Sequence, residues 1–218
     1  MTRTFGTNEL LYILQATQWT VALSGIAFLC GGIIGLLVAV LRISPYAPLR
    51  WLSSGYIQLF QGTPLLMQLF LAYFGLAVLG LELDPWTAVT LGFTLHASAF
   101  LGDIWQGCLR AVPFAQWEAS RALSLSYFQA LRRVIGPQAL KISVAPTVGF
   151  LVQLIKGTAL ASIIGFVELT RAGQLINNVT FNPMLVYGLV ATIYFCICFP
   201  LAHASTWFER HLNRPLGR

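Results

Sequence analysis

The segment Pro113–Leu140, which reads PFAQWEASRALSLSYFQALRRVIGPQAL, is the longest part of the chain that could not lie in hydrocarbon. On a helical wheel the run Tyr127–Ile135 places its apolar side chains in one arc, with Gln129, Arg132 and Arg133 opposite. This pattern predicts an amphipathic helix outside the bilayer core. The rest of the chain is organised on both sides of this segment.

Two short helices are predicted within this segment. Pro113 suits the first turn of the earlier helix. Ser126 followed by Gln129 has the pattern of a capping box, which begins the second helix, and Pro137 is expected to end it. Two interpretations stay open at this point: an amphipathic pair that rests on a membrane surface, or a socket for a cytoplasmic partner.

The composition is that of an integral membrane protein, because 57% of the residues are hydrophobic and only 9% are charged. The net charge of +6 does not point to nucleic acid, since the basic residues are scattered between apolar runs. The cysteines lie in or beside these runs without a histidine at zinc-ligand spacing, so no metal site is expected. They are Cys30, Cys108, Cys196 and Cys198.

The sequence predicts an all-α integral membrane protein with one transmembrane domain over residues 1–218. Five runs approach the roughly 20 apolar residues that a spanning helix needs: Trp19–Leu41, Leu52–Leu79, Trp86–Leu109, Ile142–Gly165 and Met184–Phe208. The two-helix segment 113–140 connects the third and fourth runs. The mixed stretch Thr2–Gln18 is expected to lie along the membrane interface.

The first run is rich in glycine, which lets neighbouring helices approach closely. These glycines are Gly25, Gly31, Gly32 and Gly35. The second run is interrupted by Gly62-Thr63-Pro64. Such a break is tolerated in a membrane where the backbone faces protein or a water-filled cavity, so this segment is a candidate for a translocation path.

The basic residues predict the orientation. One side of the membrane receives ten of them: Arg42, Arg50, Arg110, Arg121, Arg132, Arg133, Lys141, Arg210, Arg214 and Arg218. The other side receives only Arg3 and Arg171. The two-helix segment and the C-terminus are therefore expected in the cytoplasm, with the N-terminus and a Glu168–Arg171 loop outside.

Three ionisable side chains lie inside predicted spans, where burial of charge is costly. At about 1.5 Å per residue, Asp103 lies about 10 Å from the cytoplasmic end of its span, and His96 and Lys156 lie about 21–22 Å from theirs. An Asp103–Lys156 ion pair is therefore poorly matched. Lys156 is either a cation that attracts a substrate carboxylate or a lysine paired with its neighbours, and His96 is either a path residue or a satisfied core histidine.

Two functional classes fit these residues. An ion-coupled secondary carrier would use His96, Asp103 and Lys156, although no internal repeat of the kind such carriers often have is visible. The other class is a permease driven by a partner. The chain has no G-x-x-x-x-G-K-[ST] loop, so it is not expected to hydrolyse ATP or to be an enzyme. A purely structural scaffold would not explain the broken second span.

Three motifs together resemble the membrane permease subunits of bacterial ABC importers, in the polar amino acid branch. Glu118-Ala119-Ser120, with Ser124 and then Val134–Pro137 following, is similar to the family's E-A-A…G…I-x-L-P signature. QGTPLLMQLFLAYFGL, from Gln61, resembles the branch's RGTPLL segment. KGTALASIIGFVELTRAGQLI, from Lys156, resembles its K-x-T-S-L and E-L-x-R-x-x-Q segment.

The resemblance implies a bacterial inner-membrane subunit that binds no cofactor itself. Its implied partners are two ATP-binding subunits that carry ATP and magnesium, a second permease subunit and an external solute-binding protein that delivers an amino acid. The residues implied in coupling to the ATPase are Glu118, Ala119, Ser120, Ser124, Gly136 and Pro137. The candidate path residues are Gln61, Thr63, His96, Asp103, Lys156 and Thr158.

The chain departs from the family pattern at several positions. Ser124 replaces a glycine at a sharp turn, where a left-handed backbone would cost about 1 kcal/mol. Gly136 replaces a leucine beside the proline. Gln61 and Gln106 stand where arginines are usual, and Ala159 replaces a serine. Because a partner subunit could supply the two missing charges, a heterodimer is favoured over a homodimer.

Overall fold

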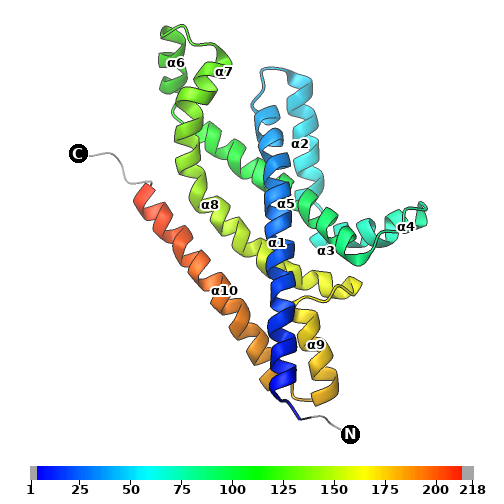
Figure 1. Cartoon of the computed structure of the whole chain (residues 1–218). Helices are drawn as coiled ribbons and strands as arrows, with labels where there is room; N and C mark the ends of the chain where they lie inside the picture. Colours follow the sequence, from blue (N-terminus) through cyan, green and yellow to red (C-terminus); the bar gives the residue numbers. More distant parts are fainter. Residues whose placement is uncertain (1–3, 213–218) are drawn as a thin grey trace.

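The computed structural model describes residues 4–212, with side chains over residues 4–210, and this part of the chain is helical and contains no strand (Figure 1). The helices are α1 (Thr7–Arg42), α2 (Ala47–Gln61), α3 (Leu65–Phe70), α4 (Leu76–Val78), α5 (Pro85–Ala111), α6 (Phe114–Ala122), α7 (Tyr127–Ala130), α8 (Gly136–Gly157), α9 (Leu169–Thr180) and α10 (Pro183–Leu212). Two π-helical turns, η1 (Leu71–Gly75) and η2 (Leu131–Ile135), and a 3₁₀ turn, η3 (Thr158–Ile164), continue them.

Helices α1 and α5 form the centre of the molecule and approach each other through small residues. A Cβ atom added to Gly31 would lie 2.7 Å from the Cβ of Ala97, and one added to Gly35 would lie 2.9 Å from the carbonyl oxygen of Ser98. These distances are too short for any larger side chain. Gly31 and Gly35 therefore have the predicted packing role, whereas a Cβ atom added to Gly25 would meet no atom within 4 Å. Helix α5 is covered by α1 along much of its length.

The predicted interfacial segment Thr2–Gln18 is wrong for residues 7–18, which continue α1 without a break; Thr2 lies outside the described residues. The reason is tertiary packing. Ile13 and Ala16 on this part of α1 are buried against Leu169 of α9 and Val186 of α10. A mixed sequence is therefore held as a helix by contacts with elements that are far away in the chain.

The second predicted span is broken where expected, at Gly62-Thr63-Pro64, but it is not one straight helix. The helices on either side of the break are bent by 100°. Helix α2 runs alongside the upper part of α1 in Figure 1, whereas α3 and α4 turn away to the side. The break therefore redirects the chain and lays α3 across α5.

By length and composition, three helices within the described residues can cross a membrane, and the bent pair would be a fourth. They are Thr7–Arg42, Tyr127–Ile164 and Pro183–Arg210, with Ala47–Gln61 and Leu65–Val78 as the bent pair. Helix α5 matches the predicted third span within two residues but is not among them. The chain is thus an all-helical membrane protein, and a count of five spans stays a prediction.

Pro137 does not end the second short helix as predicted. Helix α7, the π turn η2 and α8 form one continuous helix, so the helix that contains the fourth predicted span begins well before Ile142. The wide turn η2, in which Gly136 donates its N–H to the carbonyl oxygen of Leu131, precedes the proline. A widened turn gives the ring room that an ordinary helical turn lacks.

The expected outer loop Glu168–Arg171 is the beginning of a helix, α9. The Glu168 carboxylate caps it by accepting hydrogen bonds from the backbone N–H groups of Thr170 at 2.9 Å and Arg171 at 2.8 Å. The capping residue is completely buried. In Figure 1, α9 and the N-terminal end of α1 lie at one end of the molecule, and α6 and α7 lie at the other.

Candidate functional site

The two short helices α6 and α7 are joined by a tight turn, and we call residues 113–140 the coupling element. Ser124 in this turn has a left-handed backbone with φ of 54°, the conformation for which the replacement of the family's glycine carries an energetic cost. Ser126 then caps α7, and the reciprocal capping box with Gln129 is present as predicted. Helix α6 begins at Phe114, with Pro113 as its capping residue.

The coupling element is anchored on three helices at once. Ile135 is buried in a small apolar cluster with Val112, which follows α5, and Ala139 of α8. Trp117 stacks on Tyr127 with ring centroids 5.5 Å apart. The Tyr127 hydroxyl donates a 2.9 Å hydrogen bond to the carbonyl oxygen of Ile43 at the end of α1. A displacement of the element would therefore be transmitted to α1, α5 and α8.

The residues expected to couple to an ATPase differ in exposure. Glu118, Ala119 and Ser124 are exposed on the outside of the element. Ser120 is only 1% exposed, and its hydroxyl donates to the carbonyl oxygen of Gln116 at 2.7 Å. The Ser120 side chain therefore packs on the inner side of α6 and does not lie on the outer surface with the other three.

Gly136 and Pro137 lie where the element passes into α8. A Cβ atom added to Gly136 would lie 2.7 Å from the carbonyl oxygen of Leu131, so the π turn requires glycine here. Gly136, which replaces the family's leucine, therefore coincides with the π turn η2. Pro137 is exposed and follows directly in the first turn of α8.

The candidate path residues of α2, α3 and α5 lie in hydrogen-bonded pairs. The Gln61 amide donates to the Asp103 carboxylate at 3.2 Å. Two turns earlier on α5, His96 Nδ1 lies 3.1 Å from Gln68 Oε1. Together with Thr63, these four side chains form what we call the polar surface. The polar surface therefore combines residues from α2, from the break, from α3 and from α5.

Gln68 was missed by the sequence reasoning, although it holds the break together. Its amide nitrogen lies 2.7 Å from the carbonyl oxygen of Phe60, and 3.0 Å from both the carbonyl and the hydroxyl oxygen of Thr63. The two carbonyl oxygens lie beside the break, where the helical hydrogen-bond pattern is interrupted. The sequence signal was a single glutamine in an otherwise apolar run directly after the proline.

The polar surface lies on a face of α5 that the described chain does not fully cover. His96 and Phe100 are partly exposed, and Asp103 and Gly107 are exposed. Residues at this spacing share one face of a helix. An exposed carboxylate in a membrane helix needs a neighbouring subunit, a water-filled path or a ligand.

Lys156 lies in the last turn of α8 and Thr158 begins η3, and residues of α10 lie near both of them, Cys198 near Lys156 and Tyr194 near Thr158. A Cβ atom added to Gly157, between them, would lie 3.5 Å from side-chain atoms of Leu65 and Phe93. Lys156 is exposed, and Thr158 is buried with its hydroxyl donating to the carbonyl oxygen of Ile155. Asp103 accepts from Gln61 and makes no ion pair with Lys156 in the described structure, in agreement with the mismatch in depth.

Two further features bear on ligands. Gln106 is buried, with 6% of its side chain exposed, so it does not contribute to the exposed polar surface. Among the described side chains, residues 4–210, no three His, Cys, Asp or Glu groups lie close enough together to hold a metal ion.

Comparison with known proteins gives a consistent result. The family described as "Binding-protein-dependent transport system inner membrane component" matches residues 31–216. The chain is 36% identical to the probable amino-acid ABC transporter permease protein YckA of Bacillus subtilis (strain 168), over 86% of this chain and 83% of that protein. It is also 36% identical to the L-cystine transport system permease protein TcyB of the same organism, over 92% of this chain and 86% of that protein.

Solved structures share the fold. A chain of an amino acid ABC transporter crystallised with histidines has a TM-score of 0.86 and 31% identity, covering 95% of this chain and 99% of that chain. A chain of the MetNI methionine ABC transporter, in an inward-facing conformation, has a TM-score of 0.81 at 21% identity, covering 96% of this chain and 100% of that chain.

Proposed function

The chain belongs to the family of binding-protein-dependent transport system inner membrane components, and on this premise we propose that it is a permease subunit of an ATP-driven importer for an amino acid. The substrate class is supported by relatives named as amino-acid and L-cystine permeases. Nothing in the relatives supports the alternative of an ion-coupled secondary carrier. The observation that carries the proposal is the anchored coupling element with its exposed Glu118 and Ala119.

In this proposal the coupling element is the lever that converts ATPase movement into movement of the spans. Small exposed side chains such as Ala119 let a partner helix or cleft approach closely. Trp105 of α5 donates a 2.8 Å hydrogen bond to Thr147 of α8, so the two helices that continue the element are also joined to each other. ATP and magnesium belong to the partner ATPase, and this chain supplies only the mechanical contact.

The path is proposed to run along the polar surface, between this chain and a second permease subunit. Asp103 has only a neutral partner, Gln61, where the family pattern has an arginine. Its negative charge can therefore meet a cation of the second subunit or the ammonium group of a passing amino acid. This leaves a heterodimer favoured over a homodimer.

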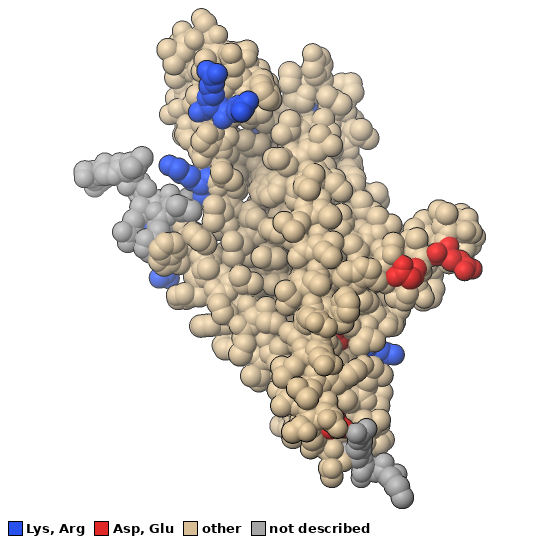
Figure 2. Space-filling model, in the orientation of Figure 1, with Lys and Arg blue, Asp and Glu red and all other residues tan. Residues whose placement is uncertain are grey.

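The orientation proposed is the one that the basic residues favour, with the coupling element in the cytoplasm. In Figure 2, Lys and Arg side chains gather over α6–α8, whereas Asp and Glu side chains lie on the α4–α5 connection and toward the end that carries α9, where a basic side chain is also visible. The end with α9 and the start of α1 would then face an external solute-binding protein. The C-terminus would be cytoplasmic, although residues 213–218 lie outside the described part.

Reconstitution tests the proposal. Proteoliposomes with this chain, its ATPase, a second permease and a binding protein should accumulate amino acid only with ATP, and vanadate should stop uptake. Uptake driven by a proton or sodium gradient without ATP would instead favour a secondary carrier. Omission of the second permease tests the heterodimer: full transport by this chain and the ATPase alone would exclude an obligatory one.

A further inference from the structure

Four arginines converge on one cavity at the end of the molecule that carries the coupling element. The cavity has a volume of about 330 Å³ and lies between the end of α1, the start of α2, the end of α5 and the element itself. Arg42, Arg50, Arg110 and Arg121 line it, and no acidic residue does. Four positive charges this close together repel one another, and a bound anion would lower this repulsion.

The arginines are not neutralised by the chain. Arg50 donates to the backbone carbonyl oxygens of Ser44 at 3.1 Å and Pro45 at 2.9 Å, which fixes its position but leaves its charge. The side chains of the other three donate no hydrogen bond to any residue between 4 and 212. Guanidinium groups bind phosphate oxygens in a bidentate manner, so a phosphate group fits this donor set.

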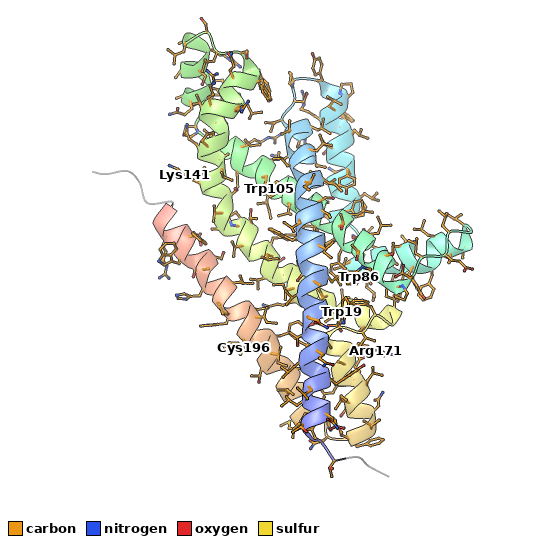
Figure 3. All side chains as sticks on the ribbon, in the orientation of Figure 1. Trp19, Trp86, Trp105, Lys141, Arg171 and Cys196 are labelled. Atoms are coloured by element: carbon orange, nitrogen blue, oxygen red, sulfur yellow. The ribbon has the colours of Figure 1, made fainter. Side chains whose placement is uncertain are left out.

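An apolar groove adjoins the arginine cavity on its membrane side. It has a volume of about 470 Å³ and lies between α1, α5 and α8, with Leu109 lining both spaces. Along α1 the lining residues Leu29, Ile33 and Leu36 recur at helical spacing, and Ile43 continues the same stripe into the arginine cavity. The side chain of Trp105, labelled in Figure 3, borders the groove from α5.

We propose that this pair of spaces binds one anionic phospholipid, with the headgroup phosphate among the arginines and an acyl chain in the groove. A charged cavity and an apolar groove that share the lining residue Leu109 offer room for the two parts of such an amphiphile. Trp117 and Tyr127 beside the cavity are aromatic residues of the kind enriched at the headgroup level, and basic pockets between helices bind anionic headgroups. A bound phosphate would tie the α1–α2 turn to the coupling element.

Tryptophan quenching by lipids with brominated acyl chains tests this site on the full chain in detergent. Brominated phosphatidylglycerol should reach half-maximal quenching at a roughly 30-fold lower concentration than brominated phosphatidylcholine. The double variant Arg42→Gln, Arg110→Gln should bind the two lipids equally. Lys141→Gln with Arg210→Gln removes the same charge from exposed positions outside the cavity and should keep the preference.

The groove is tested separately by filling it. Gly32 lines the groove, and a Cβ atom added there would lie 3.4 Å from Trp105, whereas one added to Gly25 on the same helix meets nothing within 4 Å. Gly32→Leu should weaken binding of both lipids at least tenfold, and Gly25→Leu should not. Inorganic phosphate, which has no acyl chain, should not displace the lipid at equal concentration.

Three results would overturn the proposal. The first is equal binding of the two lipids by the wild-type chain, which would leave an acidic protein surface as the partner of the arginines. The second is a preference that survives in the double arginine variant. The third is displacement of the lipid by inorganic phosphate.

Discussion

At the scale of single residues, one glutamine makes the broken helix pair stable. Gln68 reaches back to Phe60 and Thr63 with its amide nitrogen and toward His96 with its amide oxygen. The 100° bend between α2 and α3 brings these groups together. The polar surface is therefore built around a break whose carbonyl groups are hydrogen-bonded by Gln68, and the exposed Asp103 carboxylate lies on the same surface.

Lys156→Met should abolish uptake while leaving assembly intact. The side chain is exposed and does not pair with Asp103, so its loss removes a cation from the path without leaving a buried carboxylate unpaired. Coulomb attraction to a carboxylate at 4 Å is about 4 kcal/mol at an effective dielectric of 20, and one third of this corresponds to tenfold in rate. Uptake should fall at least tenfold in proteoliposomes. Lys141→Met is the matched control, and wild-type uptake by Lys156→Met would contradict this role.

Glu168 should make stability depend on pH. Burial raises the pKa of its carboxyl group above 4.5, against the hydrogen bonds from Thr170, Arg171 and Tyr194 that lower it. Because the folded-state pKa is raised, the protonated form stabilises the fold, and this stability is lost as pH rises through the raised pKa. The melting temperature should fall as pH increases from about 4.5 toward neutrality, and Glu168→Gln should flatten this trend. Exposed Glu82→Gln is the control; an unchanged trend in Glu168→Gln would refute the assignment.

The sequence was informative about single polar residues but not about their partners. Residue depth along straight helices was enough to argue against an Asp103–Lys156 pair. It could not reveal the Gln68–His96 contact, because that contact depends on the bend that lays α3 across α5. Similarly, Glu168 was placed in a loop because nothing local shows that a buried carboxylate caps α9.

At the scale of elements, the passage from the coupling element into α8 depends on the π turn η2. Gly136 donates to Leu131 across this turn, and the proline follows without ending the helix. The sequence predicted a stop because proline ordinarily ends a helix, and a π turn has no signal in hydrophobic spacing. The capping box, by contrast, follows from local chemistry and was predicted correctly.

Gly136→Ala should destabilise this passage. The added Cβ atom would lie 2.7 Å from the Leu131 carbonyl oxygen, a distance that forces the backbone to shift at a cost of about 1–3 kcal/mol. The melting temperature should fall in detergent. Gly149→Ala in the same helix, where the nearest atom would be 3.7 Å away, should have little effect. Equal effects of the two substitutions would show that η2 does not require glycine.

Ala119→Trp should uncouple transport without unfolding the chain. Ala119 is exposed, so a bulky residue fits the isolated subunit but blocks close approach of the ATPase. Ser120→Trp should instead prevent folding of α6, because Ser120 is buried. The two variants are compared by membrane insertion and by ATP-driven uptake. Normal uptake by Ala119→Trp would contradict the proposed contact.

At the scale of the whole molecule, the central helix α5 is covered by other helices on one side and is partly exposed on another. Helix α1 covers α5 on one side, while the face of α5 that carries His96 and Asp103 stays partly open. Hydropathy predicted an all-helical membrane protein and placed the third and fifth runs within a few residues of α5 and α10. It did not predict that the N-terminal segment joins α1, because that helix is held by packing against α9 and α10.

Cysteine cross-linking tests directly whether the coupling element contacts the ATPase. In a chain whose four cysteines have been replaced, Glu118→Cys lies on the exposed side of α6 and Arg171→Cys lies on α9, at the opposite end. With a thiol-to-amine cross-linker in the assembled transporter, the account predicts that position 118 captures the ATPase subunit and position 171 does not. Capture of the ATPase at position 171, with none at position 118, would contradict both the coupling contact and the proposed orientation.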